Sequence, residues 1–258
     1  MKHFRSKSFH ITWVLAIAFA GAALFYIEQH YNAPLADYPI TQSKTQIIEP
    51  RGSQPAKITP SPTSYKLPAT FLLHVPFTPQ APTANWDELH NEACEEVSVI
   101  MTQQYFAGDQ RAILPPEEVE EQISKLTEWE DNHFGYHLDV NSQETAQLLE
   151  NFYGLKTKIL TDYNQDTIKQ ELAKKHLVLL PANGKLLGNP NFRSPGPPYH
   201  MLVIKGYNSN LFITNDPGTR KGQSYPYSFS TLYKANGNFD HATHSVNLNE
   251  KNIIVVWK

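Results

Sequence analysis

The chain has 258 residues, of which 12% are aromatic and 18% charged, and its formal net charge at pH 7 is -3. This balance gives no basic surface for nucleic acid, and the glycines are not spaced as a phosphate loop or a dinucleotide fingerprint. One cysteine is present, which excludes an internal disulfide. We therefore expect no nucleic-acid partner, no cofactor and no metal.

The first segment, residues 1–30, joins a basic flank to an apolar run. Lysine and arginine within the first seven positions precede a stretch from Ile11 to Ile27 whose only polar residue is Thr12. Such a segment is a transmembrane anchor or a secretory signal. The run continues past the small residues of a candidate cleavage site, so we favour an uncleaved anchor with its N-terminus in the cytoplasm. We expect the rest of the chain to be tethered outside the cytoplasm, or secreted if the segment is cut.

Residues 31–70 are rich in Pro, Ser and Thr and have too little apolar surface to offset the entropy cost of ordering, which predicts a tether. Residues 71–258 have the size of one domain with a substantial core. We expect this domain to be a monomer.

The predicted elements of the domain alternate little between helix and strand. A short strand near residue 71 enters a proline-broken loop, and four helical segments and four strand segments follow. The helices cover 91–107, 115–126, 141–154 and 166–176, and the strand-like runs cover 177–182, 200–207, 211–218 and 252–258. Helices come first and an antiparallel sheet second, which predicts an α+β fold.

The first of these helices carries the lone thiol. It begins near Asn91 or Glu92, and Gly108 stops it. Apolar positions recur at helical spacing on one face: Ala93, Val97, Ile100, Met101 and Tyr105.

Cys94 lies in the first turn of that helix. The helix dipole and unpaired backbone N–H groups there favour the thiolate and can lower the thiol pKa. Glu95 and Glu96 oppose this, because nearby negative charge disfavours a second anion. We therefore expect a protonated His200 to supply most of the activation.

His200 and Asp216 are predicted to pair across a β-hairpin. With the hairpin centred on Ser209, Asp216 faces Leu202, and alternation puts His200 on the same face as Asp216 as a diagonal neighbour. A histidine oriented by a carboxylate is the base half of a nucleophilic triad. A one-residue slip in register would separate the two.

Gln80 lies on the loop before the helix, and its amide can join the backbone N–H of Cys94 as an oxyanion donor. The chain order is then Gln, Cys, His, Asp. The segments "VPFTPQAP", "NWD", "ACEEVSVIM", "PPYHMLVIKGYN" and "FITNDPGTRKG" resemble the C39-like branch of the papain-like cysteine peptidases over residues 71–258. The resemblance implies a papain-like fold with Cys94 as nucleophile, His200 as base, Asp216 as its orienting partner and Gln80 in the oxyanion hole.

Three functions are consistent with these residues. The first is hydrolysis of a peptide, or of a peptidoglycan-like amide, by a membrane-tethered cysteine peptidase. The second is acyl or peptidyl transfer, in which an amine replaces water. The third is a non-catalytic binding module that keeps the fold but has a thiol impaired by Glu95 and Glu96.

Other polar and aromatic groups have simpler interpretations. His133 and His137 lie four residues apart, but Gly135 and the neighbouring aromatic residues favour packing over metal binding. Trp86 is expected to pack in the core. The Pro- and Gly-rich segment 183–199 leads directly into His200 and is predicted to form a cleft wall.

Overall fold

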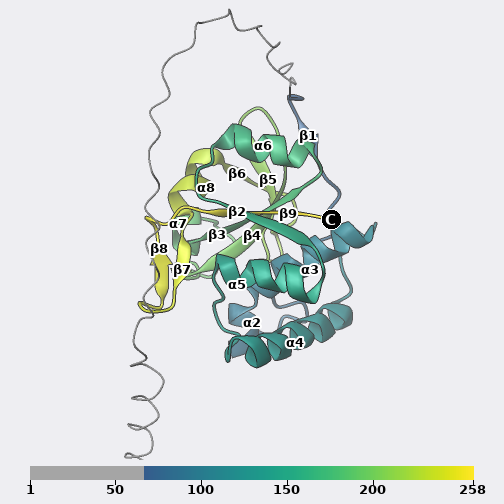
Figure 1. The fold of residues 1–258 in the computed structure, drawn as a ribbon, viewed down its shortest axis with the longest axis vertical. Coiled ribbons are helices and arrows are strands. Elements are labelled where there is room, and N and C mark those ends of the chain that lie inside the picture. The colour runs from purple at the N-terminus through teal and green to yellow at the C-terminus, as the bar shows by residue number, and fades with distance from the viewer. Residues whose placement is uncertain (1–66) are drawn as a thin grey trace, which may run out of the picture. The chain divides into compact units, whose positions relative to one another are not determined.

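The computed structural model describes residues 67–258 (Figure 1). The predicted anchor or signal segment, residues 1–30, and the linker as far as residue 66 lie outside the described residues. Within residues 67–258, no helix combines the length and the apolar character that a membrane span requires.

A seven-stranded antiparallel sheet forms the centre of the domain. Its strands follow the order β2-β9-β3-β4-β5-β6, with β1 paired to one end of β4, and β7 and β8 form a separate ribbon. The strands are β1 (Phe71–Leu72), β2 (Lys156–Leu160), β3 (Leu177–Ala182), β4 (His200–Tyr207), β5 (Leu211–Asn215), β6 (Tyr225–Ser228), β7 (Asn238–Asp240), β8 (Ser245–Asn247) and β9 (Ile253–Trp257).

The helices surround this sheet. They are α2 (Glu88–Glu92), α3 (Cys94–Ala107), α4 (Pro116–His133), α5 (Ser142–Gln147), which continues as the π-helical turn η1 (Leu148–Phe152), α6 (Gln165–Ala173), α7 (Gly184–Leu187) and α8 (Phe229–Ala235). Every residue of β3 and β4 is buried, so these two central strands are covered on both faces.

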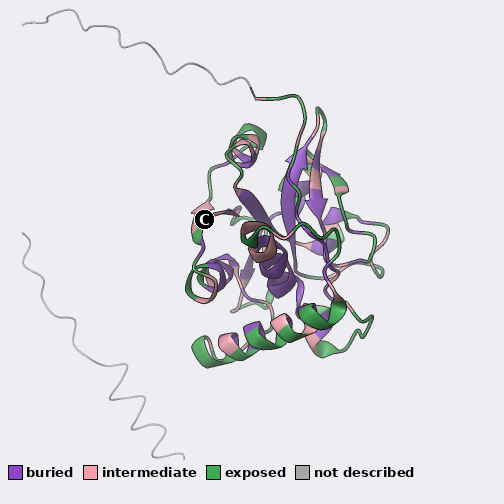
Figure 2. Cartoon of the chain, turned by 90° about the vertical axis from the view of Figure 1, so that its right-hand side faces the viewer, coloured by how far each residue is buried: buried purple, intermediate pink, exposed green. Residues whose placement is uncertain are grey.

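Helix α3 is buried all round in its first half, rather than on one face. Every residue from Cys94 to Thr102 is buried, polar ones included, and Figure 2 shows this helix enclosed by other elements. It lies between β4 on one side and α4 on the other. A helix enclosed by a sheet and a second helix has no solvent face in that region. Burial therefore extends around the whole first half of α3 instead of covering one apolar face.

The start of α3 also differs from the expected single helix. Asp87 caps α2, its side chain accepting from the backbone N–H of His90, and α2 ends at Glu92. Ala93 leaves helical geometry, with ψ of 26°, and α3 begins at Cys94. Because this break restarts the helix, Cys94 becomes the first residue of α3. Gly108 ends α3 in the left-handed conformation, as predicted.

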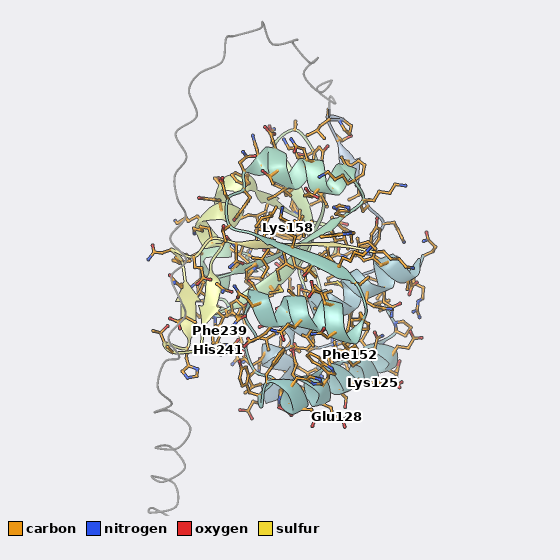
Figure 3. The ribbon with its side chains drawn as sticks, viewed as in Figure 1. Lys125, Glu128, Phe152, Lys158, Phe239 and His241 are labelled. Atoms are coloured by element: carbon orange, nitrogen blue, oxygen red, sulfur yellow. The ribbon has the colours of Figure 1, made fainter. Side chains whose placement is uncertain are left out.

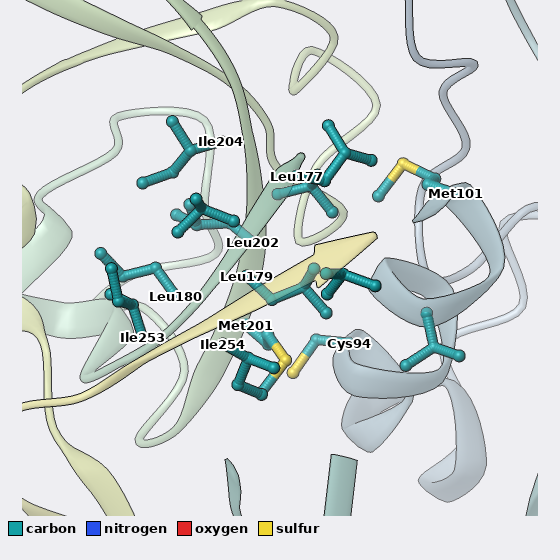
Figure 4. Close-up of a cluster of buried hydrophobic side chains, with 14 of the residues drawn as sticks. Cys94, Met101, Leu177, Leu179, Leu180, Met201, Leu202, Ile204, Ile253 and Ile254 are labelled. Atoms are coloured by element: carbon teal, nitrogen blue, oxygen red, sulfur yellow. The ribbon is translucent and has the colours of Figure 1, made fainter. Parts of the chain in front are cut away.

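The α+β class is confirmed, but helices and strands are more mixed along the chain than predicted. Strand β2 precedes α6, and α7 and α8 interrupt the strand-rich C-terminal part. The large aliphatic core joins β3, β4 and β9 to α3, and Figure 4 shows Leu179, Met201 and Ile254 of the three strands in it with Cys94.

Candidate active site

The β4–β5 hairpin has the predicted register at the end that carries the site. Val203 faces Asn215 and Ile204 faces Thr214, and a bulge between Ile204 and Gly206 shifts the pairing only nearer the turn. His200 is the first residue of β4, and Asp216 directly follows β5.

The predicted contact between His200 and Asp216 is confirmed. The Nε2 atom of His200 lies 2.8 Å from Oδ1 of Asp216, and both side chains are completely buried. Since an ionised carboxylate only accepts, Nε2 is the donor. The other oxygen, Oδ2, accepts from the hydroxyl of Tyr227 at 2.7 Å and from the amide of Asn189 at 3.1 Å.

Asp216 is held as an anion by these partners. Burial alone would raise its pKa, but the charge of His200 and the donors around the carboxylate leave the pKa below its usual value. The backbone N–H of Gly218 also donates to Oδ1 at 3.1 Å. Tyr227 and Asn189 were not identified from the sequence, because their contribution depends on β6 and the 183–199 segment folding back over Asp216.

The second ring nitrogen of His200, Nδ1, is buried and has no hydrogen-bond partner among the described residues. The ring is fixed from the side by Phe192, whose centroid lies 5.2 Å away edge to face. Gly218 closes the other approach: a Cβ atom there would lie 2.9 Å from Cε1 of His200. Only glycine fits this position without moving the ring, so the imidazole has one defined orientation.

Cys94 lies beside the start of β4, with its sulfur inside the domain. Ser98, one helical turn further along α3, donates to the backbone carbonyl of Met201 at 3.3 Å, so the same side of the helix faces the strand that begins at His200. Cys94 is 3% exposed, and in Figure 4 its side chain turns toward Met201.

The Cys94 sulfur donates to Oε2 of Glu95 at 2.8 Å. Burial raises the thiol pKa well above its ordinary value, and the charge of Glu95 and this hydrogen bond raise it further. The expected lowering by the helix dipole is therefore outweighed. In the conformation described, Cys94 is a neutral thiol paired with a carboxyl group.

Two more buried acids lie next to this pair. Glu96 and Glu130 are almost completely buried, and none of their four carboxyl oxygens has a hydrogen-bond partner among the described residues. Burial raises both pKa values, that of Glu96 to about 7 and that of Glu130 to about 12 with the charge of Glu96 adding to it. Two buried acids that raise or perturb each other's pKa titrate as a coupled pair, and burial favours the protonated form of both.

Gln80 is buried rather than solvated, with 4% of its surface exposed. Its amide nitrogen donates to the carbonyls of His90 and Asn91, at 2.9 Å each, while its backbone N–H donates to the carbonyl of Pro217 at 2.9 Å. Gln80 thus ties the end of α2 to the turn after Asp216. Both amide hydrogens are engaged, so the oxyanion role stays a prediction that would require one of them to be released.

A cleft of about 1060 Å³ opens beside Gln80 and Gly218. One wall comes from residues 80–92, and the other from residues 190–198 and 218–221. The 183–199 segment therefore contributes a wall, as predicted. Trp86 was expected in the core, but it is 44% exposed and lines the cleft, because the capped helix α2 holds the preceding loop at the surface.

A second hollow, of about 670 Å³, shares Glu88 and Glu92 with the first. Its far side includes Phe239 and His241 at β7, which lie together in Figure 3. Glu144 binds His241 at 2.8 Å, a pairing that no local sequence signal indicates.

The two spaced histidines near the end of α4 have separate partners. His133 stacks on Trp129, with ring centroids 3.8 Å apart, and His137 lies 2.8 Å from a carboxylate oxygen of Asp131. Across residues 67–258, no group of three or more His, Cys, Asp and Glu side chains is arranged to hold a metal ion.

Comparisons with known proteins agree with the C39-like motifs. The sequence model of the Peptidase_C39 like family matches residues 72–242. No curated protein matches. Among solved structures, one described as a C39-like peptidase from Bacillus anthracis is 16% identical, covers 73% of this chain and 98% of its own, and has a TM-score of 0.46.

Proposed function

This chain belongs to the peptidase C39-like family, and on that premise we propose that it is a cysteine peptidase that hydrolyses peptide or related amide bonds with Cys94, His200 and Asp216. The fold expected for such an enzyme is papain-like. The α+β arrangement, with the cysteine first in a central helix and the histidine first in a strand, supports it.

One observation carries the proposal. The His200 ring is held by Asp216 through Nε2, while the buried Nδ1 has no partner. An unpaired buried polar atom costs about 1–3 kcal/mol, and such strain is retained where a reaction uses the free atom. A thiol at the start of the adjacent helix is the group that Nδ1 would deprotonate.

The reaction begins with the sulfur leaving Glu95. Rotation about the Cα–Cβ bond of Cys94 brings Sγ toward Nδ1 of His200, which takes the thiol proton, and the imidazolium is stabilised by Asp216. The thiolate attacks the carbonyl carbon and forms the carbon–sulfur bond. The carbon–nitrogen bond then breaks as His200 returns the proton to the leaving amine. Water, deprotonated by His200, hydrolyses the thioester and frees Cys94.

The proposal is tested with an electrophilic probe for active-site thiols. Cys94→Ala and His200→Ala should each abolish labelling, and Asp216→Ala should weaken it, because the ring remains but loses its orientation. Labelling that persists unchanged in His200→Ala contradicts the mechanism. A native circular dichroism spectrum of each variant at the assay temperature separates loss of chemistry from loss of fold.

A second function, a binding module without turnover, is favoured by one observation: the thiol is hydrogen-bonded to Glu95 and its pKa is raised. The rate of iodoacetamide alkylation against pH separates the two. A peptidase should show a reactive thiolate population that disappears in His200→Ala. A single titration at or above the ordinary thiol value, unchanged in that variant, supports the binding module.

We also propose that the domain acts outside the cytoplasm on a membrane tether. The apolar run from Ile11 to Ile27 and its basic N-terminal flank support this. The full chain should stay with membranes after carbonate extraction, and a chain lacking residues 1–30 should be released. Release of the full chain would indicate cleavage or contradict the anchor, and the mass of the released protein distinguishes the two.

A further inference from the structure

The cleft beside Gln80 has opposite charges on its two walls. Residues 190–198 and 218–221 contribute Arg193, Arg220 and Lys221 and no acid, and we call these three residues the cationic wall. Residues 80–92 contribute Glu88 and Glu92 and no cation. The walls do not neutralise each other, because no ion pair joins them among the described residues.

The cationic wall has no acidic partner of its own. Arg193, Arg220 and Lys221 are exposed, and none forms an ion pair within residues 67–258. Arg111, in contrast, binds Asp109 and Glu118 at 2.7 and 2.8 Å. Three unpaired cations lining one side of a cleft raise the local concentration of anionic ligands.

The cationic wall is also adjacent to the reacting groups. Arg193 directly follows Phe192, whose ring packs edge to face on His200. Arg220 and Lys221 follow Gly218, whose backbone is fixed against the same ring and donates to Asp216. Both segments that hold the His200 ring therefore continue into cations, and Phe192 and Gly218, which contact the ring, line the same cleft as the cationic wall.

We propose that the cationic wall binds an acidic side chain of a peptide substrate, next to the bond that is cleaved. The inference rests on the proposed function and names the substrate class for that site. The carboxylates of Glu88 and Glu92 on the facing wall repel further acidic groups, which restricts the acidic residue to the cationic side.

The shape of the cleft favours a peptide over a free anion. Its volume of about 1060 Å³ has room for several residues, and Trp86 and Phe192 supply apolar contacts beside the charges. A small anion would use only the cations, whereas an acidic peptide uses both kinds of surface.

The test measures binding separately from turnover. The full chain carrying Cys94→Ala is titrated against blocked hexapeptide pools, labelled with a neutral dye, in which one position is fixed as Asp, Asn or Lys and the others are randomised. The Asp pool should bind about fivefold more tightly than the Asn pool, as expected for partly solvated ion pairs. The Lys pool should bind more weakly than the Asn pool, and the preference for Asp should shrink as salt is raised.

Matched variants locate the effect. Arg220→Gln together with Lys221→Gln should abolish the Asp preference, with Arg193→Gln as a second variant of the same wall. The control is Lys156→Gln together with Lys158→Gln, which removes the same charge from β2, at the opposite edge of the sheet from β6 (Figure 3). This control variant should keep the preference for Asp. All five residues are exposed, so folding should be unaffected.

Several outcomes overturn the inference. The first two are equal binding of the Asp and Asn pools, and a preference for Asp that survives in the Arg220 and Lys221 variant. The other two are a failure of every pool to bind, and equal displacement of the Asp and Asn pools by inorganic phosphate at constant ionic strength. Wild-type protein assayed on the same pools tests the proposed function independently. Asp-selective binding without cleavage would support the cationic wall as a binding surface and contradict the peptidase function. Cleavage without a charge preference would support the peptidase function and contradict the cationic wall.

Discussion

Asp216 and Glu96 are both buried carboxyl groups, yet their surroundings push their pKa values in opposite directions. Asp216 is surrounded by donors from His200, Tyr227 and Asn189, and its pKa is lowered. Burial raises the pKa of Glu96 to about 7, because the groups near it, Glu130 among them, lower the pKa too little to offset burial. Burial opposes the charge at both places, so the neighbouring donors decide which carboxyl group is an anion at neutral pH.

This difference has a functional meaning. In the proposed reaction, the strand end that carries His200 would stabilise the charge that forms on the ring. The first turn of α3 instead holds buried acids and a thiol whose pKa values are raised. Four substitutions that alter the donors and acids of these two regions test the comparison.

The largest expected effect is from Asp216→Ala. It leaves the completely buried His200 ring without its partner, which should lower the free energy of unfolding by about 3–5 kcal/mol. Urea denaturation of the variant and the wild type at pH 7 measures this. Asp240→Ala, which removes an exposed-turn carboxylate that bonds Ala242 and Thr243, is the control and should cost much less. Equal losses would contradict the special role of the buried pair.

Glu130→Gln should change the pH dependence of stability. Glu96 ionises near pH 4.5 when unfolded and near pH 7 when folded, so the native state holds the extra proton and wild-type stability falls as pH rises through this window. The fall should be about 3 kcal/mol between pH 4.5 and 8. Glu130, whose own pKa is raised further, contributes a second fall over the same window. This second fall should disappear in the variant, whereas the fall from Glu96 should remain.

The measurement for Glu130→Gln is a urea midpoint at each pH. Raised pKa values of His90, Glu95 and Asp139 contribute a fall of the same sign, so the quantity to compare is the difference between wild type and variant. Glu128→Gln, on the exposed side of α4 (Figure 3), should follow the wild type. A variant curve parallel to the wild-type curve would contradict the raised pKa of Glu130.

Tyr227→Phe should weaken the donor set of Asp216 without removing the carboxylate. Loss of one hydrogen bond to a charged group should cost about 2 kcal/mol at pH 7. The lowered pKa of Asp216 stabilises the fold above its unfolded value of 3.8, and this contribution is lost as pH falls through the folded pKa. The penalty should therefore shrink toward pH 2. Tyr225→Phe removes a neighbouring hydroxyl that makes no hydrogen bond among the described residues, and should be nearly neutral.

Glu95→Gln has the smallest expected effect and acts on rate rather than stability. It removes the carboxylate that accepts from Cys94, so the thiol pKa should fall and the thiolate fraction at pH 7 should rise. Alkylation by iodoacetamide should therefore accelerate, by about the factor expected for loss of one neighbouring charge, roughly tenfold. Unchanged or slower alkylation would show that Glu95 does not hold the thiol in its neutral form.

The pairing of His200 with Asp216 was predictable because a short hairpin fixes both residues locally. Strand alternation and the turn position determine which side chains share a face, and no distant element is needed. The same holds for the end of α3 at Gly108, where the left-handed cap is a property of one residue.

The surroundings of Cys94 were not predictable in this way. The spacing of apolar residues located α3. It did not show that Glu130 of α4 and Asp139 of the following loop would lie near the first turn of α3, where they interact electrostatically with Glu95 and Glu96. The contacts of Gln80 were not predictable either: its amide was expected to face an oxyanion, but the end of α2 at Glu92 leaves the carbonyls of His90 and Asn91 free to accept from it. The surroundings of Cys94 and of Gln80 both depend on tertiary packing, which the spacing of residues along the chain does not predict.

The bulge between Ile204 and Gly206 separates the hairpin turn from the charged pair. Since the pairing offset changes there by one residue, an added or deleted residue at Ser209 can be absorbed at Lys205 without rotating His200 or Asp216 to the other face. The turn is therefore a place where this domain could accept an inserted tag or reporter loop while its chemistry at the far end of the same two strands stays in alignment.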